Sequence, residues 1–412
     1  MFIKLASWNI GWFGNLLQGR KRDLIATQIT SGAGRALQKK QRRQIAREIE
    51  LIDADILCIL EGPAMSGAAL LEAFCAHDLN GAYTVIKRPA GDPSFVRGAQ
   101  GIWFIVRSTL VESLSPSLLP IDRWREATEY ESRPSPNQPG DHSKQGTWPI
   151  RPPWFKPLVS TKTEVAKLGN AAGDPPVPQL RAREHFHWRH PQVLVCEIKG
   201  RRVDFIGLHL KSKFQDVNEY KKAAAVLEKA NPTAAEIALV EKVEQKAIES
   251  RIKLTTEAID VRLYVDNRFR NEQNPIIFML GDLNDGIGKE YFERLYLFHD
   301  LLTNLQGDVF FSRRFFNHAL FDYGIESDDN FRWTAHFQDA WDPYRPPEIL
   351  LDHIMFTQSV VGPKFALAPL DVAGKAGKVE HDAHVAANAV FASAEEGTSD
   401  HRAVSVMVEV ES

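Results

Sequence analysis

Five short apolar runs in this chain share one layout, in which each run leads into polar side chains that can do chemistry, and a sixth run carries two such residues within it. Buried carboxylates raise the free energy of a fold unless they are paired or bound to metal, so folding alone does not explain the repetition. Sheet ends are where α/β proteins usually place their sites. The layout therefore predicts one site at the edge of a sheet. The polar residues that follow or interrupt the six runs are Asn9, Glu61, His209, Asp282 with Asn284, Asp352 with His353, and Asp400 with His401.

The stretches between these runs alternate between helical and extended patterns. Helical spacing is present from Arg35 to Ile52, from Leu70 to Ala76, and from Val217 to Phe269 with a break at Asn231-Pro232. Further strands are expected at 193–198 and 203–208, joined by a tight turn, and at 403–410. We therefore predict a single α/β domain over residues 1–412, with insertions at about 116–190 and 217–250.

The first insertion is rich in proline, which removes backbone donors from a sheet or helix. We expect it to be loops without regular structure. It could be a covering loop with no special role, or a lid that is specific for the substrate.

Composition narrows the class of protein. Hydrophobic residues make up 44% and charged residues 25% of the 412 residues, as in ordinary globular chains. No apolar run approaches the roughly 20 residues of a membrane span, and the start of the chain is typical of a strand instead of a signal peptide. Three scattered cysteines, Cys58, Cys75 and Cys196, predict neither a disulfide framework nor a zinc site. We expect a cytoplasmic protein.

The residue types at the strand ends indicate a reaction. Carboxylate and amide oxygens form the hard-oxygen site that Mg²⁺ or Mn²⁺ prefers. Two histidines and a further aspartate are then left for proton transfer and charge stabilisation. Lys211 and Lys213 add local positive charge beside His209. Metal, acids, histidine and lysine together predict hydrolysis of a phosphate ester.

At this point the chain resembles the endonuclease/exonuclease/phosphatase superfamily, which includes deoxyribonuclease I. The matching pieces are Ser-Trp-Asn-Ile, the glutamate after the second strand, Gly-Leu-His-Leu-Lys-Ser-Lys, Gly-Asp-Leu-Asn-Asp, Leu-Asp-His-Ile and Ser-Asp-His, in the family's order from Ser7 to His401. The resemblance implies a four-layer α/β sandwich of two packed mixed sheets flanked by helices. Leu60, where many members have glutamine, and the two insertions depart from the family pattern.

The resemblance also implies metal ligands. Asn9 and Glu61 would hold the metal side of the site, with Glu61 as the main ligand, and Asp400 would lie near the metal. The implied cofactor is Mg²⁺, or Mn²⁺.

Catalytic roles follow from the same resemblance. Asp282 would orient or deprotonate the attacking water, and Asn284 would help to position it and the phosphate. His209 would contact the phosphate or assist the leaving oxygen. His401 would stabilise charge on the phosphate, and Asp352 would orient His401 through a carboxylate–imidazole hydrogen bond.

Substrate is less constrained by the sequence. Lys211, Lys213 and Arg189 are candidate substrate contacts, and the basic stretch 39–47 could contact a phosphate backbone or form a solvated helix face. Trp124, Trp148, Trp154 and Trp188 could stack on bases or hold loops in place. Nucleic acid is the expected substrate and partner, although a net charge of −3 requires a local basic patch. The alternatives are a phosphatase or phosphodiesterase for a small metabolite or lipid head group, and a catalytically silent binding module.

The sequence gives weaker indications of a functional role for four other histidines. His353 is expected to pack or to hydrogen-bond. His185, His187 and His190 alternate as on a strand, but no cysteine or carboxylate stands at ligand spacing, which argues against zinc.

Overall fold

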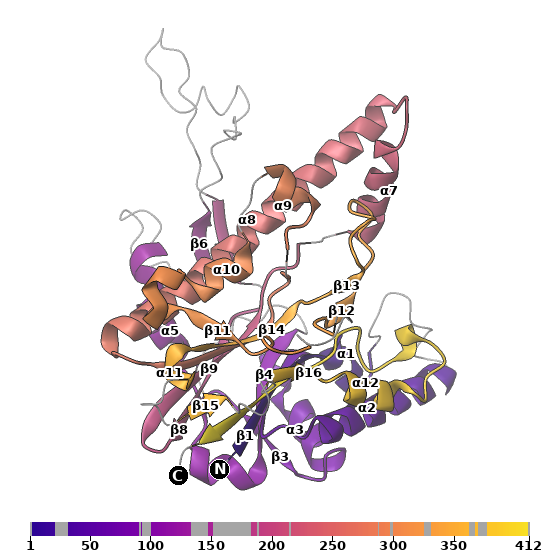
Figure 1. Ribbon diagram of the computed structural model, residues 1–412. Helices are drawn as coiled ribbons and strands as arrows, with labels where there is room; N and C mark the ends of the chain where they lie inside the picture. Colours follow the sequence, from indigo (N-terminus) through magenta and orange to yellow (C-terminus); the bar gives the residue numbers. More distant parts are fainter. Residues whose placement is uncertain are drawn as a thin grey trace.

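The computed structural model describes residues 2–20, 32–89, 92, 100–132, 147–150, 183–187, 189–213, 216–286, 288–296, 300–324, 331–361, 367–369 and 377–410. Two β-sheets lie face to face between outer layers of helices (Figure 1).

The first sheet has the strand order β15-β17-β1-β2-β4-β3, and β16 also pairs with β17. Its central strands β1 and β2 are parallel, and the other pairings are antiparallel, so the sheet is mixed. Its strands are β1 (Phe2–Asn9), β2 (Ile56–Gly62), β3 (Tyr83–Ile86), β4 (Gly101–Arg107), β15 (Leu367–Pro369), β16 (Gly377–Val379) and β17 (Val404–Val410).

The second sheet repeats this plan in the order β11-β14-β10-β9-β8-β5. Its parallel pair is β9 with β10, and its other pairings are antiparallel. Its strands are β5 (Ser117–Leu118), β8 (Gln192–Ile198), β9 (Arg201–His209), β10 (Ile276–Asp282), β11 (Phe316–His318) and β14 (Asp352–Thr357). Two small hairpins stand apart: β6 (Thr147–Ile150) with β7 (Arg183–Phe186), and β12 (Ala335–His336) with β13 (Glu348–Ile349).

Helices cover the outer face of each sheet. The described helices are α1 (Phe13–Leu17), α2 (Gly32–Ile52), α3 (Ala68–His77), α4 (Val111–Leu114), α5 (Ile121–Ser132), α7 (Val217–Leu227), α8 (Ala234–Asn271), α9 (Tyr291–Tyr296), α10 (Leu301–Gln306), α11 (Gln358–Val361) and α12 (His381–Asn388), with short 3₁₀ turns η1 (Met65–Gly67), η2 (Ser108–Leu110), η4 (Val309–Arg314) and η5 (Ala394–Glu396). Among the described residues, no helix is both long and apolar enough to cross a membrane.

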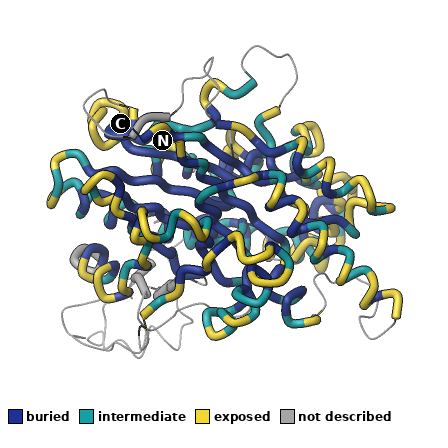
Figure 2. Tube along the Cα trace, turned by 90° about the horizontal axis from the view of Figure 1, so that it is seen from below, coloured by how far each residue is buried: buried dark blue, intermediate teal, exposed yellow. Residues whose placement is uncertain are grey.

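Packing between the layers explains the alternation of side chains along the strands. Leu5 and Phe104 of the first sheet meet Phe205 and Phe278 of the second in the central core. The opposite faces pack on helices: on α2 and α3 for the first sheet, and on α5, α8 and α10 for the second. Figure 2 shows the buried residues along the strands of the interior and the exposed residues mostly at the periphery. The predicted four-layer α/β sandwich of two mixed sheets is confirmed.

The two insertions differ in outcome. Within 116–190, the expectation of loops alone is wrong, because α5 is a regular helix over Ile121–Ser132 and two short strands follow. This helix contains no proline; the dense prolines begin at Pro134, beyond its end. Most of the remaining insertion lies outside the described residues. The predicted helical region from Val217 is confirmed as α7 and α8, and Thr233 caps α8 after the break with a capping box.

Candidate active site

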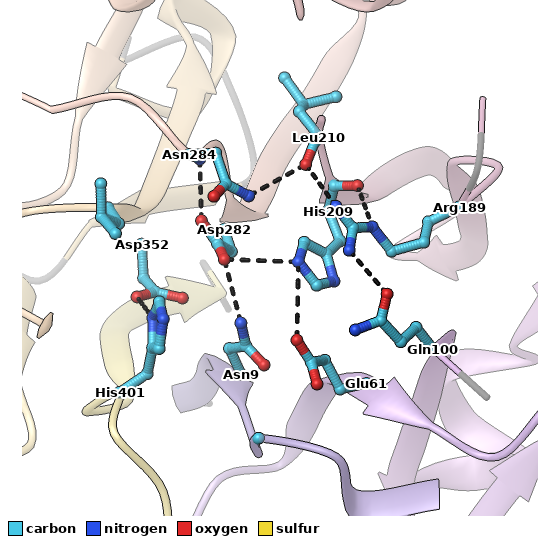
Figure 3. A network of polar contacts seen from close by, with 12 residues as sticks. Asn9, Glu61, Gln100, Arg189, His209, Leu210, Asp282, Asn284, Asp352 and His401 are labelled. Atoms are coloured by element: carbon cyan, nitrogen blue, oxygen red, sulfur yellow. Dashed lines mark hydrogen bonds and ion pairs between the residues drawn. The ribbon is translucent and has the colours of Figure 1, made fainter. Parts of the chain in front are cut away.

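Parallel pairing places four strand ends at one edge of the packed sheets. Asn9 and Asp282 end β1 and β10, His209 ends β9, and Glu61 lies one residue before the end of β2. The Asn9 amide Nδ2 donates to Asp282 Oδ2 at 3.0 Å. The His209 Nε2 atom lies 3.5 Å from Asp282 Oδ2 and 4.0 Å from Glu61 Oε1 (Figure 3). The four predicted residues therefore converge on one point.

A local irregularity in β2 presents Glu61. The register between β2 and β4 shifts between Ile59 and Gly62, and Glu61 takes a left-handed φ of 57°. Such bulges re-aim side chains next to active sites. Glu61 Oε2 accepts the backbone N–H of Trp12 at 2.7 Å. Burial raises the pKa of Glu61, and the Trp12 hydrogen bond partly opposes this rise.

The turn after β10 carries Asp282 and Asn284. Gly281 has a φ of 141°, and a Cβ there would lie 1.9 Å from the carbonyl oxygen of Leu208, so only glycine fits between the two strands. The Asn284 N–H donates to Asp282 Oδ1 at 2.8 Å, and its side-chain amide donates to the carbonyl of Leu210 at 2.9 Å. Burial raises the pKa of Asp282 to about 7, against the opposing charge of His401.

Asp352 and His401 form a buried pair beside this turn. Antiparallel pairing of β14 with β10 places Asp352 directly opposite Asp282. Asp352 Oδ2 lies 2.7 Å from His401 Nδ1. Burial alone would lower the pKa of His401, but the Asp352 carboxylate raises it well above its ordinary value, so the imidazole is held as a cation. The predicted contact between Asp352 and His401 is present.

His209 differs from His401 because its surroundings favour the neutral ring. Burial, followed by the charges of Arg189 and His401, lowers the pKa of His209 well below its ordinary value. The site thus pairs one neutral and one charged imidazole.

Arg189 lies behind His209. Its guanidinium donates to the carbonyl oxygens of His209 at 3.0 Å and Leu210 at 2.8 Å, and to the Gln100 side chain at 2.9 Å (Figure 3). It is 9% exposed. These bonds fix the end of β9, and they give no support to the predicted contact of Arg189 with substrate.

The two lysines after His209 are also bound to the protein itself. The Lys213 ammonium is buried and pairs with Asp285, with Glu293 at 2.6 Å and with Glu290 at 3.2 Å. Burial alone would lower the pKa of Lys213, but these carboxylates raise it. The Lys211 ammonium donates to the Ser212 carbonyl at 2.8 Å, and burial lowers the pKa of Lys211 to about 8. Lys213 in particular anchors the turn after β10 through Asp285.

Asp400 is exposed at the rim, next to His401. A narrow pocket of about 150 Å³ opens there and connects this edge of the sheets to the β12–β13 hairpin. Its lining includes Asn284, Asp400, His401, Lys213, His336 and Arg345.

The residues at this edge fit a divalent cation. Asn9 Oδ1 is buried and accepts no hydrogen bond from the described residues, so an acceptor oxygen stands ready beside the Glu61 carboxylate. Both are hard-oxygen ligands of the kind Mg²⁺ prefers. A second acidic cluster of Asp285, Glu290 and Glu293 has suitable spacing, but Lys213 and Arg251 already neutralise it.

The remaining sequence candidates have structural contacts. His353 bonds the Asp285 carbonyl at 2.8 Å and His318 at 2.9 Å, as a hydrogen-bonding histidine. His187 pairs with Asp260 at 3.0 Å, and Trp124 stacks on Tyr264 instead of facing solvent. Side chains of Trp148 and His185, and all of Trp154 and Trp188, lie outside what the structure describes.

Sequence reasoning missed several residues that support the site. Ser399 Oγ donates to the Asn9 carbonyl at 2.6 Å and accepts the N–H groups of Gly11 and His401, so it joins the two ends of the chain. Gln100 holds Arg189. The serine stands directly before the Asp-His pair, which is the signal that could have identified it; Gln100 has no such signal.

No family model matches this sequence. No curated protein matches it either. Among solved structures, the chain is similar to ANGEL2, a 2′,3′-cyclic phosphatase, in complex with adenosine-2′,3′-vanadate (12% identity, 100% of this chain and 96% of that chain, TM-score 0.43).

Two further similar structures are TDP2 of D. rerio with a single-strand DNA product (10% identity, 99% of each chain, TM-score 0.41) and an endonuclease/exonuclease/phosphatase family protein from Bacteroides thetaiotaomicron (13% identity, 99% of this chain and 97% of that chain, TM-score 0.40). These likenesses concern the overall course of the chain and carry nothing about its activity. From its own sheets and helices, the chain has the four-layer fold that its sequence resemblance to the endonuclease/exonuclease/phosphatase superfamily implies.

Proposed function

We propose that this protein is a divalent-metal-dependent phosphoesterase that hydrolyses phosphodiester bonds of nucleic acid. One observation carries the proposal: Asn9, Glu61, His209 and Asp282 converge from four strand ends and two sheets, beside the charged pair of Asp352 and His401. A fold gains nothing from burying so many unneutralised polar groups together, whereas an anionic substrate and a cation would satisfy them.

Each residue then has a defined task. Asp282 orients a water molecule for attack on phosphorus and accepts its proton, while Asn284 fixes the turn that presents Asp282. Asp352 holds Nδ1 of His401, so the other ring nitrogen can donate to a phosphoryl oxygen and stabilise its negative charge. His209 contributes a neutral hydrogen bond from the opposite side.

Asn9 and Glu61 would hold the cation, with Asp400 at the rim. The cation would neutralise charge on the phosphoryl oxygens as the new bond to water oxygen forms and the ester bond breaks.

Nucleic acid is our preferred substrate because the basic stretch 39–47 on α2 could contact a phosphate backbone. A second candidate is a small phosphoester, which the narrow pocket beside His401 favours.

The test is an assay with Mg²⁺ and then Mn²⁺ on supercoiled plasmid DNA, single-stranded RNA and bis-p-nitrophenyl phosphate. Asp282→Asn keeps the size of the side chain and should lower the rate by at least about 100-fold. Glu50→Gln, which changes an exposed carboxylate on α2, is the matched control and should leave the rate unchanged. Normal turnover by the Asp282→Asn protein would sink the assignment of the site. Turnover of the small ester alone would favour the second candidate.

A further inference from the structure

A groove far from the catalytic edge is lined by aromatic and basic side chains. It has a volume of about 400 Å³ and lies between the end of α8 and η4. Its lining consists of Phe269, Gln273, Phe310, Phe311, Ser312, Arg313 and Arg314. Phe310 is 92% exposed and Phe311 is 66% exposed. Nothing in the described part of the chain covers either ring.

Hydrogen bonds hold these phenylalanines outward. Asp308 Oδ1 accepts the N–H of Phe310 at 2.9 Å, and the Asp308 carbonyl accepts the N–H of Phe311 at 3.0 Å. Phe311 interrupts the 3₁₀ turn with a φ of −99° and a ψ of 55°. The Arg313 guanidinium bonds the carbonyl of Gln273 on the other wall. The segment is therefore built to present its rings.

A third phenylalanine a few residues later in the chain is buried, unlike Phe310 and Phe311. Phe316, which follows in β11, is fully buried between the second sheet and its covering helices. Exposed phenylalanines lose the gain that burial gives, so adjacent exposed rings in a fixed segment indicate a surface that a ligand covers.

Local charge indicates the sign of that ligand. The Arg314 guanidinium has no hydrogen bond or ion pair among the described residues, and Arg313 bonds only neutral groups. Of the acids near the groove, Asp266 pairs with Arg262 at 3.0 Å and Glu272 pairs with Arg268 at 2.8 Å. The single carboxylate of Asp308 caps the turn through the N–H of Phe310, against the two guanidinium groups of Arg313 and Arg314. The groove thus presents net positive charge beside its rings.

We propose that this groove is an accessory binding site for single-stranded nucleic acid. Bases would stack on Phe310 and Phe311, and Arg313 and Arg314 would contact phosphates, which is the combination that binds single strands without strong sequence preference. Gln273 and Ser312 add polar groups to the concave wall, which suits base edges better than a lipid surface. The inference rests on the proposed function and deepens it by naming single strands.

The position of the groove predicts a dependence on substrate length. Gln273 lies just before β10, whereas Asp282 ends that strand, so the groove and the site are separated by roughly 20 Å of extended chain. A short oligonucleotide would reach only one of the two sites. A long one would reach both and bind more tightly.

The test measures binding of short and long fluorescent oligothymidylate by the full-length Asp282→Asn protein. Adding Phe310→Ala and Phe311→Ala should weaken binding of the long strand about tenfold or more, and binding of the short strand at the catalytic edge much less. Arg313→Gln with Arg314→Gln should also weaken it and should flatten its salt dependence. Phe321→Ala removes a ring that is 74% exposed outside the groove and should have no effect.

Unchanged binding of long strands by both groove variants would overturn the proposal. If the same variants then lose binding to phosphatidylserine vesicles, the surface is a membrane contact instead. Turnover of bis-p-nitrophenyl phosphate by the groove variants with Asp282 intact reports on the proposed function separately. It should equal that of the unchanged protein, and a fall would mean that the substitutions disturb the catalytic site.

Discussion

At the scale of single residues, the two histidines of the site show how neighbours set function. His401 faces Asp352 and is held as a cation, whereas His209 is kept neutral by burial and by the charge of Arg189. The same side chain therefore supplies charge at one position and a neutral hydrogen bond at the other.

The His401–Asp352 pair should act as one unit. Asp352→Asn keeps the shape of the side chain but removes the charge that holds the imidazolium, and we expect at least a 100-fold loss of rate, on the order that electrostatic groups contribute. The double variant with His401→Gln should lose little more than either single variant, since both changes remove the same charge stabilisation. Steady-state kinetics of all three proteins measures this. Losses that multiply in the double variant would show that the two side chains act independently.

Individual residues also mark the limit of sequence reasoning. Asn9, Glu61 and Asp282 follow strands in the sequence, so their gathering at one edge could be predicted. Lys213 follows the same pattern, yet its ammonium is buried among carboxylates that lie more than seventy positions later in the chain. Such pairings depend on packing of elements and leave no local signal.

At the scale of elements, α8 contacts the segments that lead into and out of the site. Asp260 of α8 accepts hydrogen bonds from Trp124 of α5 and pairs with His187, which lies two residues before Arg189. Glu257 of the same helix accepts the N–H of Lys211 at 2.7 Å. Through α8, the first insertion (116–190) is thereby attached to the end of β9, which carries His209.

His187 makes this fastening sensitive to pH. Burial alone would lower the pKa of His187, but the hydrogen bond to Asp260 at 3.0 Å and the Glu257 carboxylate at 3.7 Å raise it to about 9. Because this pKa exceeds the unfolded value of about 6.5, the stabilisation is complete below pH 6.5 and is lost as pH rises through 9. We expect His187→Gln to remove on the order of 3 kcal/mol of this pH-dependent stability.

Denaturant unfolding from pH 6 to pH 10 measures this dependence in the original protein and in the variant. The difference between the two should shrink toward alkaline pH. The exposed His77 on α3 provides the control for a histidine-to-glutamine change outside the cluster of Asp260 and Glu257. A constant difference for His187→Gln across the range would contradict the linkage.

The helices show which sequence patterns were sufficient to predict secondary structure. Helical spacing predicted α2, α3, α7 and α8, because each buries one regular face. Helix α5 was missed because the dense prolines farther along the insertion dominated the pattern. Its buried face is small and centres on Trp124, whose partners come from α8.

At the scale of the whole molecule, the site is assembled from residues of both sheets. Asn9 and Glu61 come from the first sheet, and His209, Asp282 and Asp352 come from the second. The sequence predicted two mixed sheets through its family resemblance, but the pocket beside His401 depends on how the β12–β13 hairpin lies against both, which no short pattern records.

A divalent cation should therefore stabilise the entire fold. Binding only to the folded protein would add about 2.7 kcal/mol of stability at a metal concentration 100 times Kd. We expect Mn²⁺ to raise Tm, EDTA to reverse the rise, and Glu61→Gln to abolish it. Scanning calorimetry measures all three. A rise that persists in the Glu61→Gln protein would place the cation elsewhere, for example among Asp285, Glu290 and Glu293.

The pairing of β1 with β17 joins the first described strand to the last. Just before β17, Ser399 donates to the Asn9 carbonyl and the His401 carbonyl accepts the Trp8 indole N–H. Asn9, the first site residue along the chain, is therefore positioned by the segment that carries His401, the last one. During synthesis, the ribosome must release His401 before this edge can close. A nascent chain that has not yet reached His401 would carry every earlier residue of the candidate site without the contacts that close this edge.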